Sequence, residues 1–166
     1  MCSSDLAPTD PSSVAAPGNG KVDAIDEVDE PEFMGGRCKR ISIFLSVFDI
    51  HVQRAPVSGT LIYEKRTPGQ FITATKSDCG GYNENVLLGF EASRPDKAKI
   101  GCRLIAGLIA RRIIPWVQKG ETVQRSERIS LIQYGSRCDL YLPMSSKIRV
   151  KLGDRVRVGQ SVVADL

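Results

Sequence analysis

The chain has 166 residues, of which 42% are hydrophobic and 25% charged, and its formal net charge is +4. This length fits one domain with a buried core, and the composition excludes a wholly disordered or fibrous protein. The charge is unevenly placed, because residues 1–33 hold eight acidic side chains and one basic one, which leaves a net +11 on the remainder. A basic body favours an anionic partner, such as nucleic acid, anionic lipid or an acidic substrate.

Two of the common partners of a basic protein are disfavoured by the residues present. The chain has only ten aromatic residues and no finger, helix-turn-helix or aromatic-basic motif, so we expect no nucleic-acid partner. Its one histidine and its cysteines lack zinc-ligand spacing, so we expect no metal site. The five scattered cysteines indicate free thiols in a reducing compartment: Cys2, Cys38, Cys79, Cys102 and Cys138.

Residues 1–17 are small, polar and rich in proline, and they predict a flexible N-terminal lead-in. From residue 18 to 166 the chain alternates short strand-type runs with Gly, Pro and Asn turn signals, which predicts one folded domain. The clearest predicted strands are 41–48, 60–63, 86–90, 101–114, 128–134, 139–142 and 148–151. Residues 103–114 also fit a helical spacing, but Gly107 at the centre favours a strand.

Gly-acid turns recur at residues 119–123 and 152–156, each with Gly, an acid and Val at the same spacing. Such turns join short strands, because Gly accepts a positive φ and the acid can bond nearby backbone N–H groups. We therefore predict a mainly β fold, a compact sandwich or barrel of short strands. The stretch 148–166 resembles half of a biotinyl or lipoyl carrier barrel in architecture, but it lacks the exposed lysine that a carrier needs.

Three segments carry the candidate chemistry. Gly135-Ser136-Arg137 follows an apolar strand, residues 44–56 contain the only histidine, His51, and residues 16–22 form a turn that enters the first strand. Taken singly, a Gly-Ser pair is ordinarily a strand-linking turn and a lone histidine is more often structural. His51 is nevertheless the one side chain whose unperturbed pKa lies near neutrality, so a proton shuttle would use it.

In this order and with these flanks, the three segments resemble the short form of phosphatidylserine decarboxylase, from about residue 17 to the C-terminus. Further matching stretches are 83–85, 105–113 and 150–164. The resemblance implies a self-cleaving proenzyme in which Ser136 attacks the carbonyl of Gly135 and becomes a pyruvoyl group. The products would be a β chain of residues 1–135 and an α chain of residues 136–166.

The resemblance also implies the reaction, which is decarboxylation of phosphatidylserine, or a related serine phospholipid, to the ethanolamine form. The pyruvoyl carbonyl would serve as the electron sink, so neither a metal nor pyridoxal phosphate is expected. The substrate would lie in an anionic membrane surface, with the enzyme peripheral on the inner face of the cell membrane; a homo-oligomer is left open. Residues 113–116, beside Arg111 and Arg112, would form either an interfacial patch or a buried strand end.

The residue roles follow from the same resemblance. His51 would transfer protons, and Arg54 and Arg137 would bind the phosphate or carboxylate of the substrate. Longer family members have two histidines where this chain has His51 and Arg54. The family usually has Asp where this chain has Asn19, and an amide cannot stabilise a protonated imidazole electrostatically. The alternative is therefore a non-maturing barrel or binding module derived from this family.

Overall fold

The protein is described by a computed structural model, which describes residues 10–46, 52–68, 84–93, 97–107, 113–132 and 136–166. These residues form strands and turns and no helix, so the predicted mainly β fold is confirmed. The strands are β1 (Ser13–Ala15), β2 (Gly20–Glu30), β3 (Gly36–Leu45), β4 (Val52–Arg54), β5 (Gly59–Thr67), β6 (Asn85–Ala92), β7 (Lys99–Ala106), β8 (Ile113–Pro115), β9 (Thr122–Val123), β10 (Arg128–Ile132), β11 (Ser136–Leu142), β12 (Lys147–Ile148), β13 (Arg155–Val156) and β14 (Val162–Asp165).

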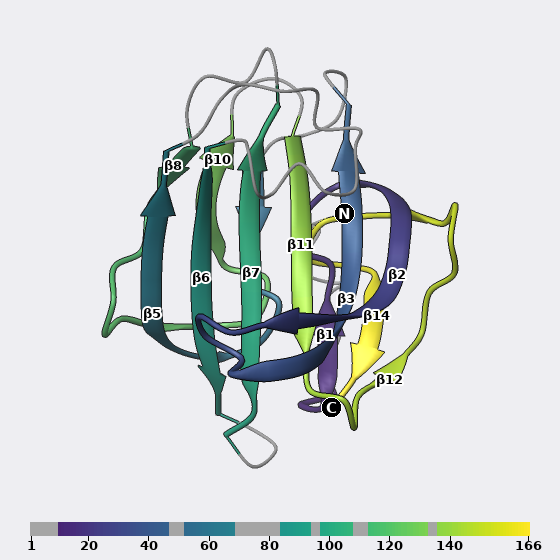
Figure 1. Ribbon diagram of the computed structural model, residues 1–166, viewed down its shortest axis with the longest axis horizontal. Helices are drawn as coiled ribbons and strands as arrows, with labels where there is room; N and C mark the ends of the chain where they lie inside the picture. The colour runs from purple at the N-terminus through teal and green to yellow at the C-terminus, as the bar shows by residue number, and fades with distance from the viewer. Residues whose placement is uncertain (1–9, 47–51, 69–83, 94–96, 108–112, 133–135) are drawn as a thin grey trace.

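The strands build one large antiparallel sheet and two small ones. The large sheet has eight strands in the order β13-β2-β3-β11-β7-β6-β5-β9, and the small sheets have the orders β1-β14-β12 and β4-β10-β8. Figure 1 shows the large sheet curving in front, with β8 and β10 behind one half and β1 and β14 behind the other. β11 therefore lies near the middle of the large sheet, between β3 and β7.

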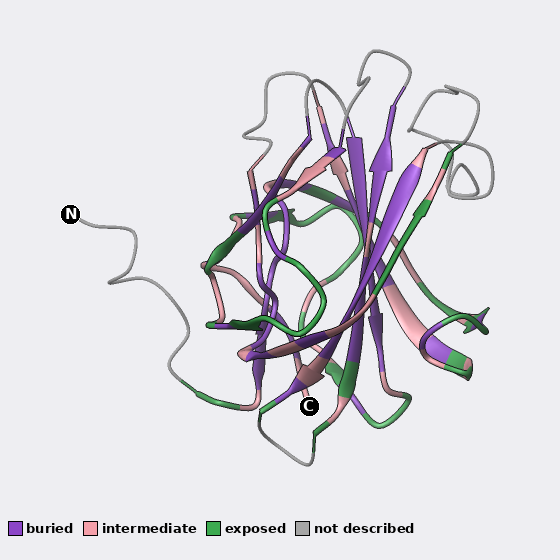
Figure 2. Ribbon diagram, turned by 90° about the vertical axis from the view of Figure 1, so that its left-hand side faces the viewer, coloured by how far each residue is buried: buried purple, intermediate pink, exposed green. Residues whose placement is uncertain are grey.

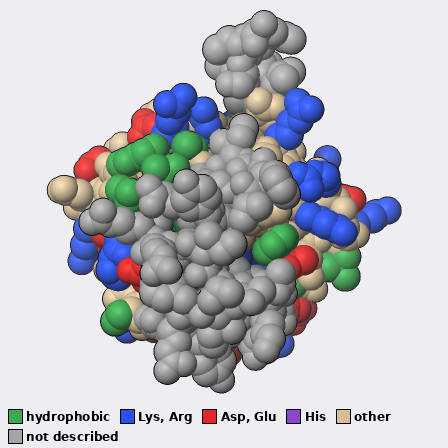
Figure 3. Space-filling view, turned by 90° about the horizontal axis from the view of Figure 1, so that it is seen from above, with side chains coloured by type: hydrophobic (Ala, Val, Ile, Leu, Met, Phe, Trp, Pro, Cys, Tyr) green, Lys and Arg blue, Asp and Glu red, His purple; other side chains and the backbone are tan. Residues whose placement is uncertain are grey.

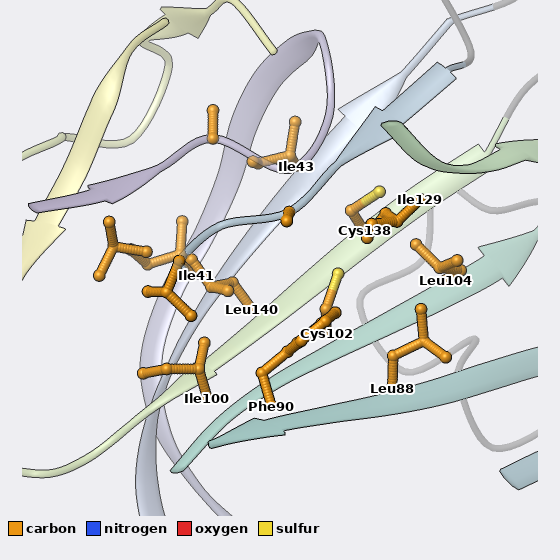
Figure 4. Packing of buried hydrophobic residues seen from close by; sticks show 14 of the residues in the cluster. Ile41, Ile43, Leu88, Phe90, Ile100, Cys102, Leu104, Ile129, Cys138 and Leu140 are labelled. Carbon is orange, nitrogen blue, oxygen red and sulfur yellow. The ribbon is translucent and has the colours of Figure 1, made fainter. Parts of the chain in front are cut away.

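The hydrophobic core fills the space between the large sheet and the small ones. Alternate residues of each strand point to the same face, so Cys138, Leu140 and Leu142 of β11 all enter this core. They meet fully buried side chains from the small sheets, such as Ile129 of β10 and Val163 of β14. Figure 2 shows burial concentrated along the strands that face each other, and Figure 4 shows the close packing around Cys138 and Leu140.

The outer face of the large sheet is partly covered by the β2–β3 hairpin. Its tip crosses the sheet in Figure 1 and places Phe33 against Gly89 of β6, where an added Cβ would lie 2.6 Å from the Phe33 ring. The Phe33 ring also lies 5.6 Å from that of Tyr63 in β5. A small second core forms there, with Tyr141 of β11 among its buried members. The outer face near β11 is thus shielded from solvent by the chain itself.

Glu30 holds the tip of this hairpin. Its carboxylate is buried and accepts hydrogen bonds from the backbone N–H groups of Glu32, Phe33 and Met34 at 3.0, 2.8 and 2.7 Å. Arg103 of β7 lies 3.7 Å from the same carboxylate. A charged acceptor that satisfies three turn donors fixes the tip on the sheet.

Replacing Glu30 by glutamine is expected to lower the free energy of unfolding by about 1.5–3 kcal/mol. The neutral amide has one acceptor oxygen and no negative charge, so it cannot bind the three backbone N–H groups as the carboxylate does. Urea unfolding followed by tryptophan fluorescence measures this difference. Glu27 is the matched control in the same strand, since its side chain forms an exposed ion pair with Arg37 at 3.6 Å. Its change to glutamine is expected to cost less than about 0.5 kcal/mol. Equal losses in the two variants would contradict this account of the hairpin tip.

The structure differs from the sequence-based expectation in two places. Within the predicted lead-in, Ser13–Ala15 forms β1, which is buried and pairs with β14, so this part is ordered by its partner strand at the other end of the chain. The acidic segment Gly20–Glu30 forms β2, although its polar character gave no clear strand pattern. Its acids oppose bases of β3 in the ladder, for example Asp29 opposite Arg37, which supports a strand that has one polar face.

The ambiguous segment 103–114 contains strands and no helix among its described residues. The single strand predicted over 101–114 is two strands of different sheets, because residues up to Ala106 belong to β7 of the large sheet, residues from Ile113 belong to β8 of a small sheet, and Gly107 lies in neither. Residues 108–112 lie outside the described part of the chain.

Candidate active site

Three chain connections join the large sheet to the β4-β10-β8 sheet, and the described strands that they link lie side by side in each sheet. β3 leads to β4, β10 leads to β11, and β7 leads to β8, while the strand orders β3-β11-β7 and β4-β10-β8 match position for position. On the large sheet, Ser136 lies opposite Leu45 and Ala106 in the two neighbouring ladders. On the small sheet, Ile132 lies opposite Ile113, and Leu131 opposite Val52. The middle connection is only residues 133–135.

This arrangement brings together the segments singled out in the sequence. Ser136 begins β11 immediately after the middle connection, so the Gly135-Ser136 bond joins that connection to the centre of the large sheet. His51 directly precedes Val52, the first residue of β4, and so belongs to the connection between β3 and β4. His51 and Gly135 themselves lie outside the described residues.

The side chain of Ser136 points into the protein. Its neighbours across both ladders, Leu45 and Ala106, are fully buried core residues, and residues opposite one another share a face of the sheet. Ser136 is itself fully buried, and its Oγ has no hydrogen-bond partner among the described residues. A buried hydroxyl left unbonded costs free energy, so its retention here needs a reason other than stability.

The turn of residues 17–20 packs against this position. A Cβ added to Gly18 would lie 3.1 Å from Cys138 Sγ and 3.2 Å from Leu45 Cδ1, so the turn touches the two strands that flank and carry Ser136. The carbonyl oxygen of Pro17 accepts a hydrogen bond from the backbone N–H of Arg54 at 3.0 Å. Asn19 is half-buried within this turn, directly before the first residue of β2. The predicted grouping of Asn19 with the Ser136 region is therefore compatible with the backbone.

Arg137 points to the opposite face of the large sheet from Ser136. Its side chain is fully buried, and its two terminal nitrogens donate to the two carboxylate oxygens of Asp23 at 2.5 and 2.6 Å. Asp23 is the extra residue of a bulge in β2, because Val22 pairs with Ile43 and Ala24 pairs with Ser42, the next residue back along β3. The pair thus reaches from β11 across β3 to β2.

Further charged groups continue along the same outer face. Asp139 is buried and accepts a hydrogen bond from Ser42 Oγ at 2.6 Å, and burial raises the pKa of its carboxyl group. Arg103 donates to the hydroxyl of Tyr141 at 3.1 Å and to Asn85 at 2.7 Å. None of Asp23, Asp139 and Arg103 was predicted from the sequence. The signal available there was the alternation in 136–142, where polar side chains stand at 137, 139 and 141.

Arg54 lies on β4, on the side of the 17–20 turn. Its Nη1 donates to the carbonyl oxygen of Ser126 at 2.8 Å, and its Cδ is the nearest atom to a Cβ added at Gly159, at 2.8 Å. The substrate-binding roles of Arg54 and Arg137 stay predictions. For Arg137 the guanidinium already binds Asp23, on the face away from the Ser136 hydroxyl.

Two buried thiols share the core face with Ser136. Burial raises the pKa of Cys102 to about 12 and raises that of Cys138 well above its usual value. Both therefore stay protonated at neutral pH and are poor nucleophiles. Among the described residues, no cluster of three or more His, Cys, Asp or Glu side chains has the arrangement of a metal site.

The chain is similar in sequence to known proteins that share one family description. The sequence profile of the family described as Phosphatidylserine decarboxylase matches residues 5–164. A Phosphatidylserine decarboxylase proenzyme from Desulfotalea psychrophila is 40% identical over 161 residues, which are 97% of this chain and 74% of the relative. The proteins of the same name from Symbiobacterium thermophilum and Erythrobacter litoralis are 40% and 37% identical, over 96% of this chain in each case and 73% and 68% of the relatives.

Proposed function

Because the chain belongs to the phosphatidylserine decarboxylase family, an enzyme family, we propose that it decarboxylates phosphatidylserine or a related serine phospholipid to the ethanolamine form. Its relatives are named proenzymes, which supports a precursor that matures by cleavage. The observation that carries the proposal is the position of Ser136: a buried hydroxyl without a partner among the described residues, at the first position of a central strand.

The proposed maturation is cleavage between Gly135 and Ser136. Ser136 Oγ attacks the carbonyl carbon of residue 135; the new C–O ester bond replaces the C–N peptide bond, and the hydroxyl proton passes to the freed amine. Loss of the α proton of residue 136 then breaks its Cβ–O bond and releases the carboxylate of residue 135. Water replaces the nitrogen of residue 136, ammonia leaves, and a pyruvoyl group remains at the start of the α chain.

The residues around Ser136 fit a group made in this way. None of the described residues forms a hydrogen bond with the hydroxyl, so its conversion removes no described hydrogen bond. The small side chain of Ala106 and the apolar side chain of Leu45 flank it and keep water away from the strand. Once formed, the pyruvoyl group supplies the carbonyl that takes up the electrons left on the α carbon of the substrate when carbon dioxide departs.

The remaining roles concern protons and the substrate anion. We assign proton transfer to His51, which belongs to the connection next to residues 133–135, and orientation of His51 to Asn19 in the adjacent turn. Arg54 remains our candidate for binding the phosphate or carboxylate of the substrate, since the residue is only half-buried. Self-association stays open, as it is in the sequence analysis.

The decarboxylase activity is tested by incubating the purified protein with phosphatidylserine in detergent micelles and measuring carbon dioxide and phosphatidylethanolamine. We expect equal amounts of both products, and loss of activity after treatment with a carbonyl-specific reagent such as hydroxylamine. A processed protein that releases no carbon dioxide would refute the proposed reaction while leaving the cleavage intact.

We also propose that the enzyme works peripherally at an anionic membrane, on the inner face of the cell membrane. Figure 3, which looks onto the end of the molecule where β11 begins, shows Lys and Arg side chains and hydrophobic side chains around its rim. Trp116 and Leu152 are 48% and 64% exposed. Ile113 is buried, whereas Ile114 and Pro115 are partly exposed, so the described part of the predicted patch opens to solvent from Ile114 to Trp116. None of the described segments forms a helix able to cross a membrane.

Trp116 is the only tryptophan of the chain, so it can report membrane contact directly. Vesicles that contain phosphatidylglycerol are expected to shift its emission to shorter wavelength at low salt, and vesicles of phosphatidylcholine alone are not. The Leu152→Ser variant keeps the reporter and is expected to weaken binding at least twofold. An emission spectrum unchanged by anionic vesicles would contradict the proposed membrane surface.

A further inference from the structure

The buried pair of Arg137 and Asp23 lies next to the bond that is proposed to break. Arg137 directly follows Ser136, and both residues are held on two sides by ladder pairing with β3 and β7. On the other side of Ser136 the chain leaves the sheet through residues 133–135. The backbone of Ser136 is therefore held in place by the ladder that continues on its C-terminal side, and Arg137 is the next residue in that ladder.

The geometry of this pair is specific. Both terminal nitrogens of Arg137 meet both oxygens of Asp23, which fixes the plane of the guanidinium as well as its position. The Arg137 side chain is 0% exposed, so it cannot turn to solvent, whereas Asp23 is 29% exposed. A buried guanidinium needs a nearby carboxylate to stay charged at low cost. The conformation at residue 137 therefore depends on Asp23.

The local structure of β2 is shaped for this contact. In a regular strand Asp23 would have a partner in β3, but the bulge at this residue gives it none and redirects its side chain along the outer face. The pair consequently spans three strands, from β2 across β3 to β11. Bulges of this kind commonly re-aim a side chain beside an active site.

We infer that Asp23, through Arg137, is a positioning residue for the self-cleavage at Gly135-Ser136. The pair locks the backbone of residues 136 and 137 so that Ser136 Oγ is held against the preceding carbonyl. Attack within a peptide chain requires the reacting atoms to be held in one narrow arrangement, and small displacements cost large factors in rate. The inference rests on the proposed maturation. It assigns Arg137 to maturation in place of binding the substrate.

The chain offers a matched control for this role. Asp26 lies on the same strand and the same face as Asp23, and it also binds a guanidinium through both oxygens, that of Arg40 at 2.9 and 2.7 Å. Arg40 belongs to β3 and is opposite Tyr141, far along β11 from Ser136. Asp23→Asn and Asp26→Asn thus break similar pairs, and only the first pair adjoins the cleavage site.

The test compares the rates at which freshly refolded full-length precursors cleave, followed by intact mass, with unfolding midpoints measured in parallel. We expect Asp23→Asn to cleave at least tenfold more slowly than wild type and Asp26→Asn to stay within twofold. Cleavage of Asp23→Asn at the wild-type rate, or slowing of both variants by the same factor, overturns the inference. If wild type itself does not cleave after residue 135, the proposed maturation is refuted, and this outcome is distinct from the two that refute only the role of Asp23.

Arg137→Lys provides a second test that depends less on folding, because it keeps the cation beside Asp23 but loses the two-point contact. We expect this variant to cleave at least threefold more slowly at an unfolding midpoint close to that of wild type. Wild-type cleavage by Arg137→Lys would overturn the inference even if Asp23→Asn did not fold.

Discussion

The Ser136→Ala variant is expected to remain a single chain of 18.1 kDa under conditions in which wild type cleaves completely. Alanine has no oxygen to attack the preceding carbonyl. The nearby thiol of Cys138 stays protonated, because burial raises its pKa, so it does not replace the hydroxyl. The expected effect is total loss of cleavage and of decarboxylase activity. Intact mass and a carbon dioxide assay measure the two losses.

Two measurements separate this chemical effect from misfolding. Since the Ser136 hydroxyl is buried without a described partner, its removal is expected to leave the free energy of unfolding unchanged or raise it by about 1 kcal/mol. Ser146 is the other buried serine hydroxyl without a partner among the described residues, so Ser146→Ala is the matched control and is expected to cleave normally. Continued cleavage in Ser136→Ala would show that the nucleophile is another group.

The Asn19→Asp variant is expected to accelerate maturation. In the serine-triad template, exchange of the orienting Asp for Asn lowers turnover by about 10⁴, because the amide favours the wrong tautomer of the imidazole and does not stabilise its protonated form. The reverse exchange is expected to speed cleavage by at least about tenfold, provided that His51 is the base that this residue supports. Time courses of intact mass after refolding measure the change.

The control for Asn19→Asp is the same substitution in a His51→Ala background, where the acceleration is expected to vanish. An unchanged rate in the single variant would show that position 19 does not act on the cleaving base. A gain that survives without His51 would show that the new carboxylate acts by itself.

The fold class and the position of Ser136 at the start of a strand could be predicted from the sequence, because both depend on the pattern of nearby residues. Alternating apolar residues in 128–132 and 138–142, interrupted by Gly135, identify two strands and the turn between them. The assignment of chemistry to Ser136 and His51 came from resemblance to a family, since neither a Gly-Ser pair nor a lone histidine is informative by itself. The structure adds that the strands flanking these two residues are neighbours, because β3 pairs with β11 in the large sheet and β4 pairs with β10 in the small one.

The contact between Asp23 and Arg137 could not have been predicted from the sequence. The two residues are 114 positions apart, and their meeting depends on a bulge that shifts the register of β2 by one residue. Register is decided by which face is buried and how strands pair, which no single segment encodes. The same reason explains why the extent of β2 was not predicted beyond the turn that enters it. Its acidic residues resemble a solvent-exposed segment, and only the structure places the basic residues of β3 opposite them.

The central claim is that Ser136 turns itself into the catalytic group, and the intact mass of purified wild-type protein tests it most directly. The predicted result is two chains of 135 and 31 residues, with the smaller one lighter by one ammonia than a chain that begins with serine. A stable, folded single chain of 18.1 kDa after prolonged incubation would contradict the claim and favour the non-maturing barrel.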